Sequence, residues 1–336
     1  MPTPRRAPLK RVTLEEVARA AGVSRATASR VVNGVTTVDE AIRSAVQRAI
    51  ADTGYVPNPA ARSLVTRRAE AVALVLPERA RLPGDPFLGR LLRGTSRVTG
   101  DHGVHLVLMT MDANTRDQVA ADLHRGRLDG VILVHPGERD PLPRRLVESR
   151  FPVVLSARPA EPLAVTHVEA DQRAGAALAA DHLRSLRRRR IVTITGPLHT
   201  AVGHDRLAGF RDTLADPDLA WVEGDFSRES GAVGMTHLVE AHPDLDAVFA
   251  ASDLMAQGAL SVLRARGRAV PADVAVVGFD DSGVALACDP PLTTVREPVE
   301  EMAAELARLL LHHIDHPDSP PARTLFTPTL VHRHSA

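Results

Sequence analysis

The chain's 336 residues are enough for two or three compact units with ordinary cores. Its 41 Lys and Arg residues balance 41 Asp and Glu residues, so the overall charge by itself predicts no polyanionic partner. Cys288 is the single cysteine, which excludes an intrachain disulfide, and no run of about 18 apolar residues indicates a helical membrane span. The basic start is followed by no apolar segment, so we expect a cytoplasmic protein without a membrane partner.

The charge is unevenly distributed along the chain. Residues 1–68 contain 12 Lys and Arg against 5 Asp and Glu, so the remainder is acidic. Arginine is abundant in both parts and only the acid content changes, which argues against codon bias as the cause. A basic head on an acidic body indicates a DNA-binding domain attached to a unit that does not contact DNA. Residues 1–11, rich in Pro and Arg, are expected to form a disordered basic tail.

Residues 13–34, TLEEVARAAGVSRATASRVVNG, have the pattern of two short helices joined by a glycine turn. Thr13 and Glu16 form a capping box at the start of the first helix, Gly22 ends it, and Ser24 can cap the second. Paired amphipathic helices also occur in proteins without a nucleic-acid partner, so a purely structural role stays open. The second helix nevertheless presents an outward face suited to a DNA groove, formed by Arg25, Ala26, Thr27, Ser29, Arg30 and Asn33.

A third helix is predicted between Asp39, which can cap it, and Gly54, which can end it. Three helices with complementary apolar stripes close a small core, so residues 12–56 are expected to be a helix-turn-helix headpiece. Residues 57–68 follow, and there Asn58 and Pro59 begin a helix too short to persist alone in water; an ordinary linker is the alternative. The inward stripe of the third helix should be Ile42, Ala45, Val46, Ala49 and Ile50.

From residue 69 onward, short apolar runs alternate with helix-length amphipathic stretches, a pattern typical of parallel sheets covered on both faces. The expected strands are residues 71–76, 104–109, 130–134 and 152–155, then 191–195, 247–251 and 274–278. They predict two doubly wound subdomains, one of about residues 69–165 plus 295–325 and one of about 166–294 plus 326–336. The predicted fold class is therefore a small all-α helix-turn-helix headpiece plus an α/β effector domain of two doubly wound parallel-sheet subdomains.

The run VTLEEVARAAGVSRATASRVVNG and the later YVPNPAARSL resemble the headpiece and hinge of the lactose-repressor (LacI/GalR) family of bacterial transcription factors. The stretches ITGPLHTAVGHDRLAGF, ASDLMAQGAL, VVGFDDSGVA and DPPLTTV are similar to that family's effector domain, which is periplasmic-binding-protein-like. The resemblance implies base-edge contacts from Arg25, Ala26 and Arg30. It implies phosphate contacts from Ser24, Thr27, Ser29 and Asn33.

The same resemblance implies that the hinge reaches DNA through Asn58, Ala61 and Leu64. In that family the hinge helix orders when a dimer sits on its operator, and Leu64 matches the leucine that wedges into the minor groove. Such a wedge spends a few kcal/mol on unstacking a base step and gains contact with bent DNA. A surface leucine without that role is the alternative.

Ligand-binding candidates come from the ends of segments in the second subdomain, where ligands of such folds meet the strands. The resemblance assigns ligand contacts to Arg206 and Asp280, and an Arg fork and a carboxylate can bond adjacent sugar hydroxyls. Ser252 matches a position often held by asparagine, which leaves the ligand class open. Phe87 and Phe226 match positions whose rings cover the ligand, with core packing as the alternative.

We expect neither an enzyme nor a cofactor or metal. The motifs G-x-S-x-G, G-x-x-x-x-G-K and H-E-x-x-H are absent. His312 and His316 are one helical turn apart, but no carboxylate or cysteine motif completes a metal site, so a solvated helix face is expected. Asp253 and Asp281, next to the ligand candidates, are expected to cap the helices that follow them.

These features predict a ligand-responsive repressor of a carbohydrate uptake or catabolism operon, which binds a palindromic operator as a homodimer. The expected effector is a sugar or sugar phosphate. The last expected strand, TLFTPTLV, is followed by no leucine heptad helix, which favours dimers over tetramers. A solute-binding protein and a regulator that responds to a purine or another non-sugar effector are the alternatives.

Overall fold

The computed structural model describes residues 12–33, 35, 37–55, 68–77, 86–112, 114–137, 140–159 and 161–336. The chain divides into two units, Met1–Ala69 and Glu70–Ala336, close to the boundary expected from the sequence. The predictions for the tail 1–11 and for Asn58, Ala61 and Leu64 of the hinge lie outside the described residues. Among the helices described, none is long and apolar enough to cross a membrane.

The first unit contains the three expected helices, α1 (Leu14–Ala20), α2 (Arg25–Val32) and α3 (Glu40–Thr53). The capping box of Thr13 with Glu16 is present, and the Ser24 and Asp39 side chains accept amide hydrogen bonds at the starts of α2 and α3. Gly54 ends α3 with φ 63°, a left-handed conformation that glycine adopts without strain. Local sequence signals therefore set the ends of these helices.

The small core of this unit is formed by Val17, Ala18, Ala28, Val46 and Ala49. Ile50 packs against it as expected, but Ile42 is 36% exposed, so its place in the inward stripe was wrong. Ile42 lies in the first turn of α3, and α3 contacts α1 and α2 mainly through residues further along the helix, such as Val46 and Ala49.

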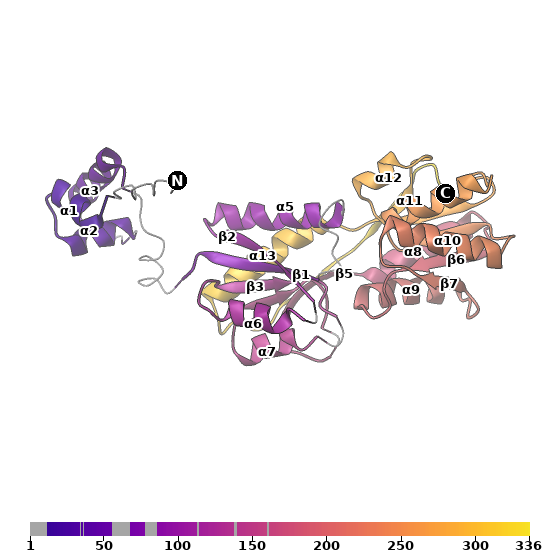
Figure 1. Cartoon of the computed structure of the whole chain (residues 1–336), viewed down its shortest axis with the longest axis horizontal. Helices are drawn as coiled ribbons and strands as arrows, with labels where there is room; N and C mark the ends of the chain where they lie inside the picture. The colour runs from indigo at the N-terminus through magenta and orange to yellow at the C-terminus, as the bar shows by residue number, and fades with distance from the viewer. Residues whose placement is uncertain are drawn as a thin grey trace, which may run out of the picture. The chain divides into compact units, whose positions relative to one another are not determined.

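The second unit contains two sheets, each with helices on both faces (Figure 1). In the described residues, six strands form the first sheet in the order β11-β5-β4-β3-β1-β2, all parallel. Figure 1 shows α5 and α13 covering one face and α6 and α7 the other. The strands are β1 (Ala71–Pro77), β2 (His105–Met111), β3 (Gly130–Leu133), β4 (Val153–Leu155), β5 (Thr166–Ala170) and β11 (Arg323–Phe326); the helices are α5 (Pro86–Asp101), α6 (Arg116–Leu123), α7 (Leu142–Glu148) and α13 (Val299–Asp315).

The second sheet, also six-stranded within the described residues, has the order β12-β10-β9-β8-β6-β7 and is parallel except for the β10–β12 pair. One core lies between this sheet and the helices α10 and α11, and another between it and α8 and α9. The strands are β6 (Ile191–Thr195), β7 (Ala220–Glu223), β8 (Ala247–Ala250), β9 (Ala275–Asp280), β10 (Thr293–Arg296) and β12 (Thr329–Val331); the helices are α8 (Gln172–Ser185), α9 (Ala201–Leu214), α10 (Arg228–Ala241), α11 (Asp253–Ala265) and α12 (Gly283–Ala287).

The chain passes between the two sheets after β5, after β10 and after β11. The approximate subdomain boundaries at 166 and 295 therefore need correction, because β5 pairs with β4 in the first sheet and β10 pairs with β9 in the second. Neither strand was predicted, since both are short and carry polar residues. The expected single strand TLFTPTLV is two strands in different sheets, with Pro328, which has no amide donor, between them.

Helices α10 and α11 pack closely, and their first turns set the places of Phe226 and Ser252. A Cβ atom on Gly258 would overlap the backbone of Arg228 and Ala232. We expect Gly258→Ala to lower the free energy of unfolding by about 1 to 3 kcal/mol in urea titrations, because overpacking forces the helices apart. Gly89→Ala is the control, since no atom lies within 4 Å of its added Cβ and alanine favours the helix. Equal stability of the two variants would contradict the expected close packing.

Candidate functional site

Helix α2 presents the outward face that the sequence predicts. Ser24, Arg25, Ala26 and Arg30 are exposed, whereas Ala28 is buried in the headpiece core. The other three candidates, Thr27, Ser29 and Asn33, are half-buried. All seven are therefore at least partly exposed, and their DNA contacts stay predictions.

Several of these polar groups are already engaged within the headpiece. The Ser24 hydroxyl accepts a hydrogen bond from the Thr27 amide at 3.1 Å and lies 2.8 Å from the Thr27 hydroxyl. Arg25 pairs with Glu15, but their side chains are 70% and 55% exposed. An exposed pair of this kind contributes at most about 1 kcal/mol, so Arg25 can leave Glu15 for a stronger acceptor at little cost.

A cleft of about 1280 Å³ lies within the second unit. Its lining comes from both subdomains, including the ends of β1 and β3 in the first and of β9 in the second. The cleft brings together all five ligand candidates predicted from the sequence: Phe87, Arg206, Phe226, Ser252 and Asp280. Their contacts with a ligand stay predictions, but their convergence is a fact of the fold.

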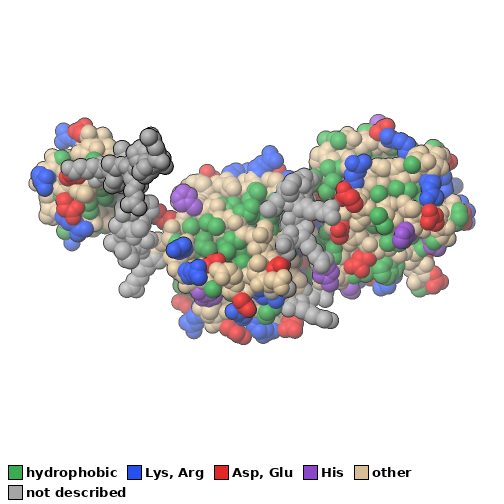
Figure 2. All heavy atoms as spheres, viewed as in Figure 1, with side chains coloured by type: hydrophobic (Ala, Val, Ile, Leu, Met, Phe, Trp, Pro, Cys, Tyr) green, Lys and Arg blue, Asp and Glu red, His purple; other side chains and the backbone are tan. Residues whose placement is uncertain are grey.

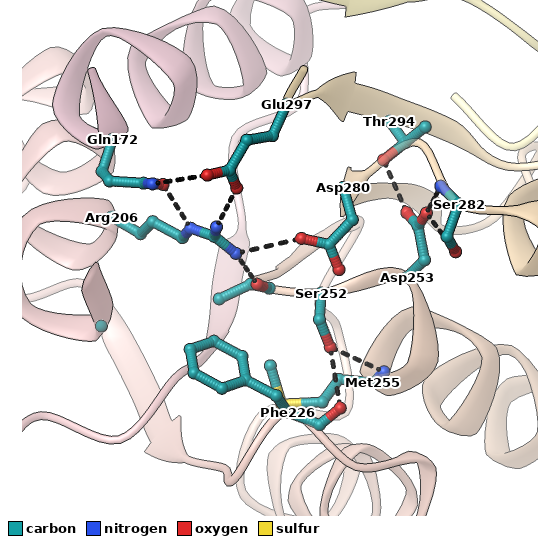
Figure 3. Close-up of polar contacts among 12 residues, drawn as sticks. Gln172, Arg206, Phe226, Ser252, Asp253, Met255, Asp280, Ser282, Thr294 and Glu297 are labelled. Carbon is teal, nitrogen blue, oxygen red and sulfur yellow. Dashed lines mark hydrogen bonds and ion pairs between the residues drawn. The ribbon is translucent and has the colours of Figure 1, made fainter. Parts of the chain in front are cut away.

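Arg206 is the most constrained residue of the cleft (Figure 3). Only 4% exposed, it donates from Nε to Gln172 at 2.8 Å and from Nη1 to the Ala251 carbonyl at 2.6 Å. Its Nη2 lies 2.9 Å from Glu297, and its guanidinium lies 3.6 Å from the centre of the Phe279 ring. The chain itself therefore uses most of the fork that was expected to bind ligand.

The Asp280 carboxylate lies 3.5 Å from Arg206 Nη1 and is 21% exposed. Its backbone has φ 113°, a conformation that is strained for any residue except glycine. The strain turns the end of β9 so that this carboxylate lines the cleft, where it can accept hydrogen bonds from hydroxyl groups.

Two buried polar residues of this cluster were missed by the sequence-based prediction. Glu297 is 2% exposed and accepts hydrogen bonds from both Arg206 and Gln172. Gln172 and Glu297 begin the segments that leave β5 and β10, and Arg90 of α5 donates to the Glu297 and Asp280 carbonyls at 2.8 Å each. The network therefore joins two crossover segments to both subdomains. A polar residue within two positions of the end of a strand was the available signal.

The two aromatic candidates lie in different subdomains. Phe226 has φ 65° and its ring centre is 5.7 Å from the Arg206 guanidinium. Phe87 is half-buried, packs partly against the first-subdomain core and stacks on His135 with ring centres 5.2 Å apart. Phe87 thus packs against the core and also lines the cleft. The two alternatives for this residue, core packing and covering a ligand, are therefore compatible.

The structure corrects the roles expected for the residues around Ser252. Ser252 caps α11 by accepting from the Met255 amide at 3.2 Å, and it donates to the Phe226 carbonyl. Asp253, expected as the cap, is the first helical residue and points away from the cap position. Asp281, expected to cap α12, instead pairs with Arg296 and Arg333, and Ser282 occupies the N-cap position. In both cases a neighbouring serine occupies the N-cap position.

Asp253 is a fully buried carboxylate that accepts hydrogen bonds from the Ser282 amide and hydroxyl and from the Thr294 hydroxyl (Figure 3). Burial raises the pKa of Asp253 to about 6, although these hydrogen bonds oppose the shift. Asp281 behaves in the opposite way, since Arg333 and Arg296 lower its pKa against the effect of burial. Burial also raises the pKa of the Cys288 thiol to about 11, which makes Cys288 a poor nucleophile.

No metal site is apparent in the part of the chain that the structure describes, where no group of three or more His, Cys, Asp or Glu side chains could hold an ion. His312 and His316 lie on and just after α13 with ring centres 4.7 Å apart. They contact each other, and no third ligand accompanies them within those residues.

A headpiece with an exposed candidate recognition helix, carried on the same chain as a two-lobed ligand cleft, defines a ligand-responsive DNA-binding regulator. Residues 13–58 match the family of bacterial regulatory proteins, lacI family, and residues 180–336 match the periplasmic binding protein-like domain. The HTH-type transcriptional regulator CelR of Thermobifida fusca is 43% identical over 335 residues, which cover 97% of this chain and 98% of that protein. The chain therefore belongs to the lactose-repressor (LacI) family, whose members are transcription regulators and not enzymes.

Two solved structures are similar along nearly the whole chain. A complex of the transcriptional regulator CelR with cellobiose has a TM-score of 0.76 and 40% identity, covering 97% of this chain and 100% of that one. The lac repressor dimer bound to operator and the anti-inducer ONPF has a TM-score of 0.84 and 25% identity, covering 97% and 99%. Among these similar regulators, one has thus been solved with a sugar and another with operator DNA.

Proposed function

We propose that this protein represses genes for the uptake or catabolism of a carbohydrate, and that a sugar in the cleft controls its binding to DNA in the cytoplasm. The observation that carries the proposal is the convergence of Arg206, Asp280 and Phe226 on one cleft. Together they offer a fixed donor, an acceptor and an aromatic face, which is the chemistry that a sugar ring with its hydroxyls requires.

The cleft favours an uncharged sugar over a sugar phosphate. Among its described lining residues, the two arginines are already paired, Arg116 with Asp140 at 3.0 Å and Arg206 with Glu297 at 2.9 Å. A phosphate would have to displace one of these carboxylates. The volume of about 1280 Å³ leaves room for more than one sugar ring, and the relative solved with cellobiose supports a disaccharide as the first probe.

We propose that the protein acts as a homodimer on a roughly palindromic operator. Val107 and Leu108 on the edge strand β2 are 39% and 40% exposed, and Leu286 of α12 is 66% exposed. Figure 2 shows hydrophobic side chains gathered on the visible face of the first subdomain, over the region of α5 and β2. A second copy would cover these apolar surfaces, as the dimeric state of a solved relative suggests. A two-fold axis would then place two α2 helices on two half-sites.

The direct test measures binding of the full chain to a palindrome from the DNA upstream of its own coding region, by fluorescence anisotropy, with and without cellobiose. We expect binding to that DNA and a change in affinity when cellobiose or another sugar of a panel is added. A response to purines with none to any sugar would replace the effector class. Equal binding to scrambled DNA would contradict the operator assignment.

Arg25 should read one operator position. Its side chain is 70% exposed, and its guanidinium can form two hydrogen bonds to guanine once it leaves Glu15. We expect Arg25→Ala to relax the preference at that position by about 1 to 3 kcal/mol, measured with operators altered one base pair at a time. Arg19→Ala is the control, because Arg19 is exposed at the end of α1 rather than on α2. An equal loss of affinity on all sequences would assign Arg25 to phosphate instead.

A further inference from the structure

Three residues that line the cleft have a left-handed backbone although they are not glycine: Phe226 with φ 65°, Asp280 with φ 113° and His135 with φ 43°. Such conformations carry strain, and they persist where the surrounding structure holds them for a purpose. Two of the three were ligand candidates from the sequence. His135 was not, and it lies in the first subdomain, just past the carboxyl end of β3.

The chain holds the His135 ring in one place. The His135 amide donates to the Ser156 hydroxyl at 2.9 Å, and that hydroxyl is buried beyond the end of β4. The imidazole stacks on Phe87 with an interplanar angle of 27°. Among the described residues, no hydrogen bond to either ring nitrogen is present. The fold therefore positions this side chain and leaves its hydrogen-bonding groups for another partner.

The surroundings favour the neutral form of this ring. Burial lowers the pKa of His135, the Glu297 carboxylate opposes that shift, and the Arg206 guanidinium reinforces it. Both of these charged groups belong to the Arg206 cluster at the opposite wall. His135 is therefore close enough for their charges to change its pKa. A neutral imidazole has one donor nitrogen and one acceptor nitrogen, and either can pair with a hydroxyl group, because a hydroxyl both accepts and donates.

We infer that His135 is a ligand-contacting residue that sets sugar specificity, with a ring nitrogen bonded to a hydroxyl of a sugar that stands between it and the Arg206 cluster. The inference rests on the proposed sugar-binding function and adds a first-subdomain contact to it. Phe87 belongs to the same wall, because its ring stacks on the imidazole with the ring centres 5.2 Å apart. The sugar thus bridges the two subdomains, and its hydroxyl pattern decides whether both walls are engaged.

The test combines variants of His135 with cellobiose analogues that each lack one hydroxyl, measured by isothermal titration calorimetry on the full chain. His135→Phe keeps the ring and removes the nitrogens, and we expect it to weaken cellobiose binding about tenfold or more. In the wild type, one deoxy analogue should show a similar loss. His135→Phe should bind that analogue and cellobiose equally, because the bond to that hydroxyl is already gone.

His135→Asn distinguishes a loss of hydrogen bonding from an effect of backbone strain. Asparagine tolerates the left-handed conformation and keeps a donor and an acceptor. Its binding should be intermediate. His237→Phe on the exposed side of α10 is the control and should bind as the wild type does. If His135→Phe retained the wild-type preference among the analogues, the role of His135 would be disproved while the proposed function stood. If the wild type bound no sugar, both would fall.

Discussion

Replacing Arg206 with Met should abolish the sugar response and lower the free energy of unfolding by about 3 to 5 kcal/mol. The reason is the partner that remains: Glu297 is 2% exposed and would keep a buried charge, with Gln172 as the remaining hydrogen-bond donor to its carboxylate among the described residues. Methionine fills much of the space of the arginine stem but supplies no donor for the Ala251 carbonyl. Urea unfolding and calorimetric titration with cellobiose measure the two effects.

The double variant Arg206→Met with Glu297→Gln is the matched control for the buried charge. It removes both charges and leaves an amide that can still bond Gln172, so its stability should recover most of the loss. Sugar binding should stay absent, because the fixed donor is missing. A double variant as unstable as Arg206→Met alone would show that packing, and not the unpaired carboxylate, causes the loss.

The second large effect is a pH dependence that comes from Asp253. The pKa of Asp253 in the folded chain is about 6, above its ordinary value of 3.8, so the folded state binds this proton more tightly than the unfolded state does. The contribution of Asp253 to stability is therefore greatest below pH 3.8 and is lost as the pH rises through 6, by about 3 kcal/mol in all. We expect Asp253→Asn to remove this pH-dependent contribution to the free energy of unfolding, and to be more stable than the wild type at pH 7.5.

The measurement is the difference between the wild-type and Asp253→Asn unfolding free energies from pH 4 to pH 8, followed by the fluorescence of Trp221. Asp281→Asn is the control with the opposite sign, because Arg333 and Arg296 lower the pKa of Asp281 and its contribution is lost as the pH falls. Parallel curves for the wild type and Asp253→Asn would contradict the assignment of this pH dependence to Asp253.

The cleft shows how far a sequence-based prediction of the site could go. Arg206, Asp280, Phe226 and Phe87 were named from a family resemblance, and the fold brings them to one cavity. Their partners were not predictable in the same way, because Glu297 is 91 residues from Arg206 and the contact exists only in the folded chain.

The short polar strands show the same limit for the fold. The segment THVEA becomes β5 through pairing with Val154 and Leu155 of β4 on one side and with β11 on the other. The alternation of residues within THVEA alone is too weak to predict a strand. Apolar strands such as Ala71–Pro77 were predictable, because a strand buried on both faces must be almost entirely hydrophobic.

By itself, the sequence determined the headpiece helices, the class of the second unit and the family, because caps, left-handed glycines and apolar periodicity act over a few residues. Tertiary structure alone decided which hydrogen-bonding groups of each cleft side chain stay accessible to a ligand. It committed most of the Arg206 donors to the chain, made Asp253 a buried acid rather than a cap, and held the His135 ring against Phe87. These outcomes depend on burial and on partners far apart along the chain, which come together only when each sheet has folded with its helices.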